Sequence, residues 1–211
     1  MNSEPLARNQ DNKRIGLMGG TFDPVHFAHT GLALAAAEEL GFEKVIMIPA
    51  FIQPFKKDKY VTSDEHRLEM LRIAVEQYDK LQVSTWEIER GGISYTYDTV
   101  MHFKEEYPDK DLWFIMGSDS LMKLENWYKG TDLLRICSFA VGTRPMDDTS
   151  KLDETIHGLK SKYGTEIYPI KQKMLPINST MVRDLLEREE PISGLVLPGV
   201  ENYIYENKLY I

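Results

Sequence analysis

The sequence predicts an α/β fold, an open parallel sheet with helices packed on both faces. Three observations support this prediction. Short apolar runs alternate with helical patterns along the 211 residues, as in parallel sheets covered by helices. Several of these runs end at a polar cluster, and a hydrophobic content of 42% in a chain of this length suits one substantial core. We therefore expect one domain over residues 14–211, preceded by a flexible polar tail over residues 1–13.

The first strand and the first helix flank an unusual loop. Ile15 to Met18 predicts a buried strand, and the segment from Thr30 to Leu40, rich in Ala, Leu and Glu, predicts a helix. The loop between them holds a glycine pair followed by His26 and His29, two of only five histidines in the chain. In an open parallel sheet, the junction of a strand with its following helix lies at the edge where ligands bind.

The later elements continue the alternation in chain order. A strand is predicted at residues 45–48, and a basic loop covers residues 53–60. A helix from about Ser63 to Tyr78 has Thr62 or Ser63 as its N-cap. Further strands are predicted at residues 81–88, 112–116, 139–142 and 167–170. Further helices are predicted at residues 96–106 and 180–189, and residues 146–162 are assigned to a loop with a helix.

The composition disfavours several functional classes. The 33 acidic and 25 basic residues give a net charge of −8, which disfavours nucleic acid or an anionic membrane as the main partner. The single cysteine, Cys137, rules out an internal disulfide framework, suits a reducing compartment and lies in an apolar setting that predicts a core position. Residues 1–13 contain no apolar signal segment, and no run approaches the roughly 18 apolar residues of a membrane span. These features predict a cytoplasmic protein.

The residue types at two places in the chain suit phosphate binding. After the first strand, a glycine pair lets backbone N–H groups approach a phosphate, and Thr21, His26 and His29 offer a hydroxyl and two ring N–H groups. Near the other end, Ser179-Thr180 and Arg183 would place two hydroxyls, helix N-terminal amides and a guanidinium on another phosphate.

Each pattern also has a structural alternative. A His-x-x-His pair occurs in helix-start packing and in zinc sites, and Ser179-Thr180 before an apolar helix is commonly a cap. The glycine pair, the following helix and the lack of a clustered third Cys or His ligand favour phosphate. Asp23, before a proline, is most simply a turn residue that orients the loop.

Both patterns resemble signatures of the nucleotidyltransferase superfamily. Residues 20–29 are similar to its Gly-Thr-Phe-Asp-x-x-His-x-Gly-His motif, with Ala28 in place of a glycine, and residues 177–183 are similar to Ile-Ser-Ser-Thr-x-x-Arg, with Asn178 in place of a serine. The resemblance implies a Rossmann-like fold and transfer of a nucleotide monophosphate unit from a triphosphate to a phosphorylated acceptor. The ATP-binding residues that it implies are Gly19, Gly20, Thr21, Phe22, His29, Ser179, Thr180 and Arg183. The catalytic residues that it implies are His26, His29, Lys56 and Arg183.

Adenylyl transfer of this kind would need little acid–base chemistry. The attacking phosphate monoester is mostly dianionic at neutral pH, because its second pKa is roughly 6. The barrier instead demands in-line alignment and neutralisation of the charge that builds on the α-phosphate and on the departing pyrophosphate. Donors and cations should therefore outnumber bases, and Mg²⁺ bound mainly through the ATP phosphates would complete the neutralisation.

Several further stretches are similar to the nicotinate mononucleotide adenylyltransferases of NAD biosynthesis. They are residues 87–99, residues 115–121 with Trp127, the pair Arg144-Pro145, and residues 197–210. The resemblance implies ATP and nicotinate mononucleotide as substrates, with nicotinic acid adenine dinucleotide and pyrophosphate as products. The nicotinate-nucleotide-binding residues that it implies are Thr96, Asp119, Trp127 and Arg144.

Physical chemistry gives two of these residues a specific role. Trp127 would stack on the pyridine ring, a contact worth about 1 kcal/mol. Thr96, at a helix start, would place its hydroxyl and backbone amides on the ring carboxylate, which a helix N-terminus favours over a neutral amide. The alternative for Trp127 is a half-buried aromatic of the core. The cluster of Glu87, Glu89 and Arg90 fits surface ion pairing.

The loop after the second strand departs from the family pattern. After the second strand the family commonly shows Pro-Pro-His-Lys, whereas this chain has Gln53-Pro54-Phe55-Lys56, so an apolar ring replaces a donor while Lys56 still offers a charge.

Two other functions remain open. A sister transferase would use nicotinamide mononucleotide, phosphopantetheine or another phosphorylated acceptor. A nucleotide-binding regulator would keep the fold with little catalysis, and the retention of His26, His29, Lys56 and Arg183 together disfavours it. All three functions are compatible with a homo-oligomer.

Overall fold

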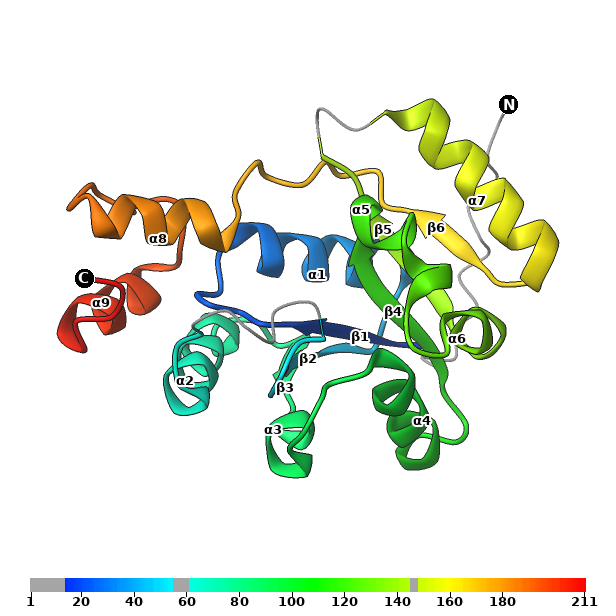
Figure 1. The fold of residues 1–211 in the computed structure, drawn as a ribbon, viewed down its shortest axis with the longest axis horizontal. Helices are drawn as coiled ribbons and strands as arrows, with labels where there is room; N and C mark the ends of the chain where they lie inside the picture. The colour runs from blue at the N-terminus through cyan, green and yellow to red at the C-terminus, as the bar shows by residue number, and fades with distance from the viewer. Residues whose placement is uncertain (1–13, 55–60, 145–147) are drawn as a thin grey trace.

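The computed structural model has a six-stranded parallel sheet with helices on both faces, as predicted (Figure 1). It describes residues 14–54, 61–144 and 148–211. The predicted tail over residues 1–13, and Phe55 and Lys56 of the basic loop, lie outside the described residues. The strands are β1 (Arg14–Gly20), β2 (Lys44–Pro49), β3 (Leu81–Val83), β4 (Asp111–Gly117), β5 (Ser138–Gly142) and β6 (Ile167–Pro169).

The strands are ordered β3-β2-β1-β4-β5-β6, and every neighbouring pair is parallel. The long helices are α1 (Phe27–Leu40), α2 (Asp64–Val75), α4 (Thr96–Glu106), α7 (Thr149–Tyr163), α8 (Ser179–Glu187) and α9 (Pro198–Glu206). The shorter ones are α3 (Trp86–Arg90), α5 (Ser118–Leu121), the 3₁₀ helix η1 (Leu124–Asn126) and α6 (Gly130–Ile136).

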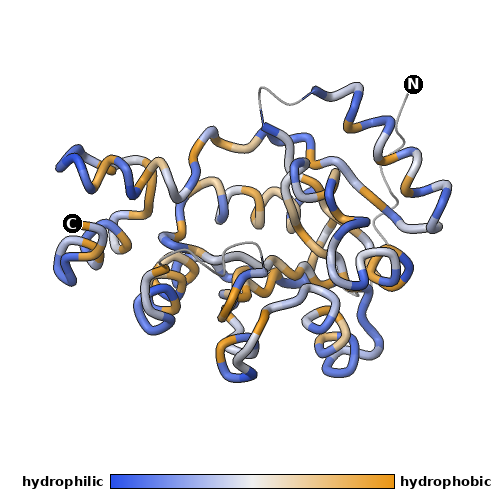
Figure 2. Tube along the Cα trace, in the orientation of Figure 1, coloured by the Kyte–Doolittle hydropathy of each residue, from blue (hydrophilic) through white to orange (hydrophobic). Residues whose placement is uncertain are grey.

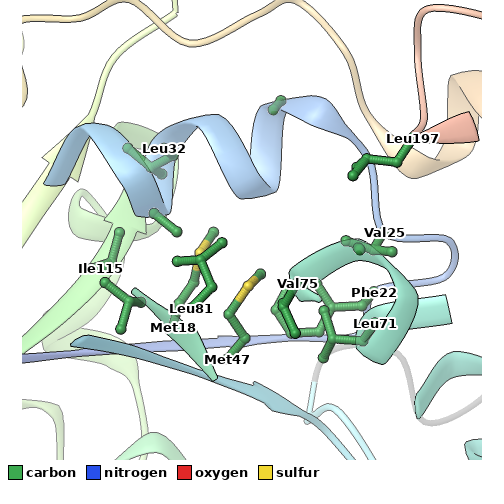
Figure 3. Packing of buried hydrophobic residues seen from close by; sticks show 14 of the residues in the cluster. Met18, Phe22, Val25, Leu32, Met47, Leu71, Val75, Leu81, Ile115 and Leu197 are labelled. Atoms are coloured by element: carbon green, nitrogen blue, oxygen red, sulfur yellow. The ribbon is translucent and has the colours of Figure 1, made fainter. Parts of the chain in front are cut away.

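Successive strand residues point to opposite faces of the sheet and build two hydrophobic clusters. In β2, Val45 and Met47 belong to the first cluster, with α1, α2, α8 and α9, and Ile46 and Ile48 belong to the second, with α4, α6 and α7. Figure 2 shows hydrophobic residues along the strands and hydrophilic residues on the outer helices. Figure 3 shows part of the first cluster, where Met47 of the sheet lies near Val75 of α2 and Leu71 of α2 lies near Phe22. Both faces are therefore buried, as a parallel sheet requires.

Side chains cap two of the three helices that border the site. Ser63 caps α2 by accepting the His66 N–H, which selects Ser63 over Thr62 as the predicted cap. Asn178 caps α8 by accepting the Met181 N–H at 2.9 Å. The N-cap of α1 is His26, so this helix begins three residues before the predicted start.

The predicted strand over residues 81–88 is wrong beyond Val83. Ser84 Oγ accepts the Trp86 N–H at 3.3 Å, and the chain turns into α3 instead of continuing in the sheet. Helices α6 and α9 were not predicted from the sequence. Cys137, between α6 and β5, is buried as predicted, and burial raises the pKa of its thiol to about 12.

The order of the strands creates a switch point between β1 and β4. The chain after β1 enters α1, on the face of the first cluster, whereas the chain after β4 enters α5, whose Leu121 belongs to the second cluster. In open α/β sheets, ligands bind in the crevice outside the carboxyl ends of the strands at such a point. The loop that follows Gly19 and Gly20 and leads to His26, called the glycine–histidine loop below, lies at this edge because it follows β1 directly.

Candidate active site

The glycine pair, Gly19 and Gly20, ends β1 in a tightly filled corner. A Cβ on Gly20 would lie 3.0 Å from the Phe22 ring, so a side chain there would have to displace that ring. Phe22 has a φ of +50°, in the left-handed region that residues with side chains rarely adopt. Its buried ring meets the edge of the His29 ring, with 5.0 Å between the ring centroids. The corner therefore sets the direction in which the chain approaches α1.

His26 and His29 lie together at the start of α1. Their rings are stacked, with 3.7 Å between centroids and 21° between planes. The backbone N–H of His26 donates to Nδ1 of His29 across 3.3 Å. A neutral His29 ring therefore carries its hydrogen on Nε2, where it can donate to another group.

Burial keeps the His26 side chain uncharged at neutral pH. The residue is 4% exposed, and burial, assisted by the positive charge of Arg144, lowers its pKa from 6.5 to about 4. Its Nδ1 is buried and has no hydrogen-bond partner among the described residues. A buried polar atom without a partner is destabilising, so this nitrogen suits a ligand that supplies the partner.

The low pKa of His26 predicts a specific sensitivity to acid. The unfolded chain takes up the proton near pH 6.5 and the folded chain only near pH 4, so the unfolded state binds more protons between these values. The free energy of unfolding should therefore fall as the pH drops from 6.5 to 4, by at most about 1.4 kcal/mol per pH unit from this group. Urea unfolding of the wild type and His26→Gln over this range measures the effect.

The contribution of His26 is the difference between the wild type and His26→Gln in the pH dependence of the free energy of unfolding. His26→Gln should lose less stability on acidification than the wild type, whereas His157→Gln, at an exposed position of α7, should follow the wild type. Equal pH dependences for all three proteins would contradict a buried, uncharged His26.

The N-terminus of α8 lies against the loop that carries the histidines. Ser179 Oγ donates to the Pro24 carbonyl at 3.0 Å, between residues 155 positions apart. Nη1 of Arg183 donates to the Asp23 carbonyl at 2.6 Å, and its Nη2 donates to Thr180 Oγ1 at 3.2 Å. The two predicted phosphate motifs are therefore in direct contact, as a shared triphosphate site requires.

The Asp23 carboxylate is held by groups from two other parts of the chain. It is buried, and it accepts hydrogen bonds from the Tyr210 hydroxyl at 2.6 Å and from the Thr62 N–H at 3.4 Å. Burial and the negative charge of Asp23 raise the pKa of Tyr210, so the hydroxyl stays a donor at neutral pH. These contacts are those of a residue that orients the loop.

The residues predicted for the acceptor lie after neighbouring strands. Thr96 is the half-buried first residue of α4, and Asp119 is exposed in α5, directly after β4. Trp127 follows η1 and packs half-buried against the second cluster. Arg144 is exposed after β5 and lies close enough to His26 to act on its pKa.

The structure divides the predicted residues into two groups across the switch point. The histidines and Arg183 lie on α1 and α8, on the face of the first cluster. Thr96 and Trp127 lie on the other face. The ring centroids of their neighbours Tyr95 and Tyr128 are 4.3 Å apart. Lys56 lies outside the described residues.

Two charged residues near these loops are buried, although their burial was not predicted from the sequence. Glu87 is 4% exposed, so its assignment to surface ion pairing is wrong; it accepts the Thr99 hydroxyl at 2.5 Å, and burial raises the pKa of its carboxyl. Arg67 is 1% exposed. Its signal in the sequence is its place on the apolar stripe of α2, three and four residues before Met70 and Leu71.

The described residues form neither a metal-ligating cluster nor a membrane-spanning helix. Within residues 14–54, 61–144 and 148–211, no group of three or more His, Cys, Asp or Glu side chains is arranged to hold a metal ion. Over the same ranges, none of the helices has the length and apolar character needed to cross a bilayer.

The chain is similar in sequence to known proteins of one family. A family model described as cytidylyltransferase-like matches residues 17–185. A Thermoanaerobacter sp. (strain X514) protein named "Probable nicotinate-nucleotide adenylyltransferase" is 38% identical over 93% of this chain and 94% of its own. A protein of the same name from Moorella thermoacetica is 39% identical over 93% of this chain and 91% of its own.

Solved structures show the same fold. Plasmodium falciparum nicotinic acid mononucleotide adenylyltransferase complexed with NaAD has a TM-score of 0.76 at 22% identity, covering 94% of this chain and 97% of that chain. A Vibrio parahaemolyticus protein described as a putative nicotinate-nucleotide adenylyltransferase has a TM-score of 0.68 at 18% identity, covering 94% of this chain and 95% of that chain.

Proposed function

This chain belongs to the cytidylyltransferase-like family, and from that premise we propose that it transfers the adenylyl group of ATP to nicotinate mononucleotide. The products are nicotinic acid adenine dinucleotide and pyrophosphate, in NAD biosynthesis. One observation carries the proposal: a stacked histidine pair, of which His26 is uncharged, and the guanidinium of Arg183 meet at a single loop at the end of β1. Relatives named for this activity are similar over 93% of the chain.

The reaction needs the kind of groups that this loop offers. A phosphate oxygen of nicotinate mononucleotide attacks the α-phosphorus of ATP, and the bond from that phosphorus to the oxygen bridging the β-phosphate breaks. The attacking oxygen is already ionised near neutral pH, since the second pKa of the phosphate is roughly 6. Uncharged His26 and the neighbouring His29 act as ring N–H donors and Arg183 as a cation, each stabilising charge on phosphate oxygens.

We propose that Mg²⁺ is bound mainly through the ATP phosphates. The donor set supports this, because the described part of the chain has no cluster of three metal-ligating side chains. Mg²⁺ commonly keeps several waters and binds through substrate phosphates. When bound, it supplies neutralisation of phosphate charge. The protein groups that hold the same phosphates are Thr21, the α8 hydroxyls and Arg183.

The preference for a nicotinate ring rests on the start of α4. Thr96 is its first residue, so its hydroxyl and its own backbone N–H stand at the helix start, where a carboxylate is favoured. The acidic Asp98 in that turn would repel a carboxylate, but Arg90 pairs with it at 2.9 Å. We propose that this helix start, with Trp127, Asp119 and Arg144, holds the nicotinate nucleotide.

Pyrophosphate release from purified protein tests the function. ATP and Mg²⁺ are supplied with nicotinate mononucleotide, nicotinamide mononucleotide or phosphopantetheine in parallel. Release with nicotinate mononucleotide, and little with the other two, is the expected result. Release with another acceptor alone would assign a sister transferase, and ATP binding without release would assign a regulator.

Substitution of Trp127 by alanine should chiefly weaken binding of the acceptor. Loss of ring stacking worth about 1 kcal/mol corresponds to a KM for nicotinate mononucleotide raised roughly fivefold. The KM for ATP should stay near the wild-type value. Steady-state kinetics with each substrate varied in turn measures both.

Trp86→Ala is the matched control for this substitution. Trp86 is also half-buried, but its ring stacks on His102, with centroids 4.3 Å apart. Its loss should leave the acceptor KM unchanged. An unchanged acceptor KM in Trp127→Ala itself would refute the stacking role.

We also propose that residues 14–211 act as one domain in the cytoplasm. The hydrogen bond from the Tyr210 hydroxyl to the Asp23 carboxylate joins the last helix region of this range to the loop after β1. The buried thiol of Cys137, with its pKa raised by burial, is compatible with a reducing compartment.

A further inference from the structure

Arg67 is a buried guanidinium that holds three carbonyl groups from separate segments. Nη1 donates to the Thr21 carbonyl at 2.7 Å, and Nη2 donates to the Ala50 carbonyl at 2.7 Å. Nε donates to the Thr62 carbonyl at 3.1 Å. Asp64, three residues earlier, forms an ion pair with the same guanidinium. All three nitrogens of this side chain therefore have a partner within the protein.

The first of these carbonyls controls a peptide of the glycine–histidine loop. The Thr21 carbonyl and the Phe22 N–H belong to one trans peptide, in which the two groups point in opposite directions. A carbonyl directed at Arg67 therefore turns the Phe22 N–H away from it. Because Phe22 has a left-handed φ of +50°, the loop keeps this conformation only while its surroundings hold it.

The second carbonyl leads to the acceptor side of the site. Ala50 follows β2, and the N–H of the next residue, Phe51, donates to Ser94 Oγ at 3.0 Å. Ser94 is two residues before Thr96, where α4 begins. Arg67 is therefore connected through Ala50 to the segment proposed to bind the nicotinate carboxylate.

From these contacts we infer that Arg67 is a positioning residue. It sets the spacing between the glycine–histidine loop, which binds the ATP phosphates, and the segment before Thr96, which binds the acceptor. It also aims the Phe22 N–H at a phosphate of ATP. The inference rests on the proposed function, from which both segments take their roles. Arg67 acts through Thr21 and Ala50, because partners from this chain occupy its guanidinium.

Arginine is required because of its shape as well as its charge. The planar guanidinium carries five N–H donors in a fixed fork and so reaches carbonyls in several directions. A lysine ammonium concentrates its donors at one atom. Arg67→Lys would keep the positive charge near Asp64 but release Thr21 or Ala50. This substitution therefore separates geometry from charge.

Steady-state kinetics of Arg67→Lys with ATP and nicotinate mononucleotide test the inference, at a temperature where the variant is folded by circular dichroism. We expect kcat to fall by about 100-fold, because a displacement of about 1 Å from a remote substitution can have that effect on positioned reactants. In amide NMR spectra, the Phe22 and Phe51 resonances should shift, and Phe22 should no longer respond to ATP.

Arg72→Lys is the matched control. Arg72 lies on the same helix and also pairs with a carboxylate three residues earlier, Glu69, but its side chain is 56% exposed. It should show wild-type kcat and unshifted Phe22 and Phe51 resonances. Equal kcat values for Arg67→Lys and Arg72→Lys would overturn the inference. So would a lower unfolding temperature of Arg67→Lys with unchanged kcat, the pattern of a purely structural residue.

If Arg67→Lys does not fold, the wild type decides the question. Addition of ATP with Mg²⁺ should shift the Phe22 amide resonance and slow its hydrogen exchange, and no response of Phe22 would overturn the inference. A wild type that releases no pyrophosphate with any acceptor would contradict the proposed function and this inference with it. An active wild type with an unaltered Arg67→Lys would overturn the inference alone.

Discussion

Alanine at position 26 is expected to lower kcat by about 100- to 1,000-fold, the loss typical of removing one donor aimed at transition-state charge. His26 is buried, uncharged and stacked on His29, and its Nδ1 has no hydrogen-bond partner among the described residues. Because the charge on the transferring phosphate grows towards the transition state, kcat should change far more than either KM. Initial rates of pyrophosphate release at saturating ATP and nicotinate mononucleotide measure the loss.

The control for this substitution is His157→Ala on the exposed face of α7. It should keep the wild-type kcat, and circular dichroism should show that His26→Ala retains the fold. A folded His26→Ala protein with wild-type kcat would remove this histidine from the mechanism.

Alanine at position 183 should lower kcat/KM for ATP by about 100-fold or more, because a charge-assisted contact with a phosphate is lost. Arg183 also donates to the Asp23 carbonyl at 2.6 Å, so its loss releases the turn before His26. Arg183→Lys should fall between the wild type and Arg183→Ala, since lysine keeps the charge without the planar fork. Kinetics with ATP as the varied substrate distinguish the three proteins.

Arg188→Ala is the matched control for Arg183. It removes the same charge from an exposed position directly after α8. Its kcat/KM for ATP should equal that of the wild type. If Arg183→Ala gave the same value as Arg188→Ala, the Arg183 guanidinium would have no role in ATP binding.

The fold followed from the sequence because its strands carry a simple pattern. β1, β2, β4 and β5 are buried on both faces, so each appears as a continuous apolar run that needs no knowledge of its neighbours. The start of α4 at Thr96 matched the prediction to the residue. α3 was missed because apolar residues still recur at Val83, Trp86 and Ile88, whereas the Ser84 hydroxyl accepts the Trp86 N–H where the chain leaves the sheet.

The candidate site was predictable where its residues are close in the sequence. His26, His29, Ser179, Thr180 and Arg183 lie in two short segments whose residue types alone suggest phosphate binding. Arg67 and Tyr210 were missed because their meaning depends on partners far along the chain. Arg67 acts on the backbone carbonyls of Thr21 and Ala50. Every residue has a backbone carbonyl, so residue types do not show which carbonyls Arg67 contacts.

The hydrogen bond between Tyr210 and Asp23 joins residues 187 positions apart. A ribosome that adds about 5–20 residues per second needs roughly 10–40 s to synthesise that stretch. The nascent polypeptide therefore carries the Asp23 turn long before its tyrosine partner exists. In the cell, the loop beside His26 gains this contact only after Tyr210 has been synthesised, and a polypeptide stalled before Tyr210 would lack it.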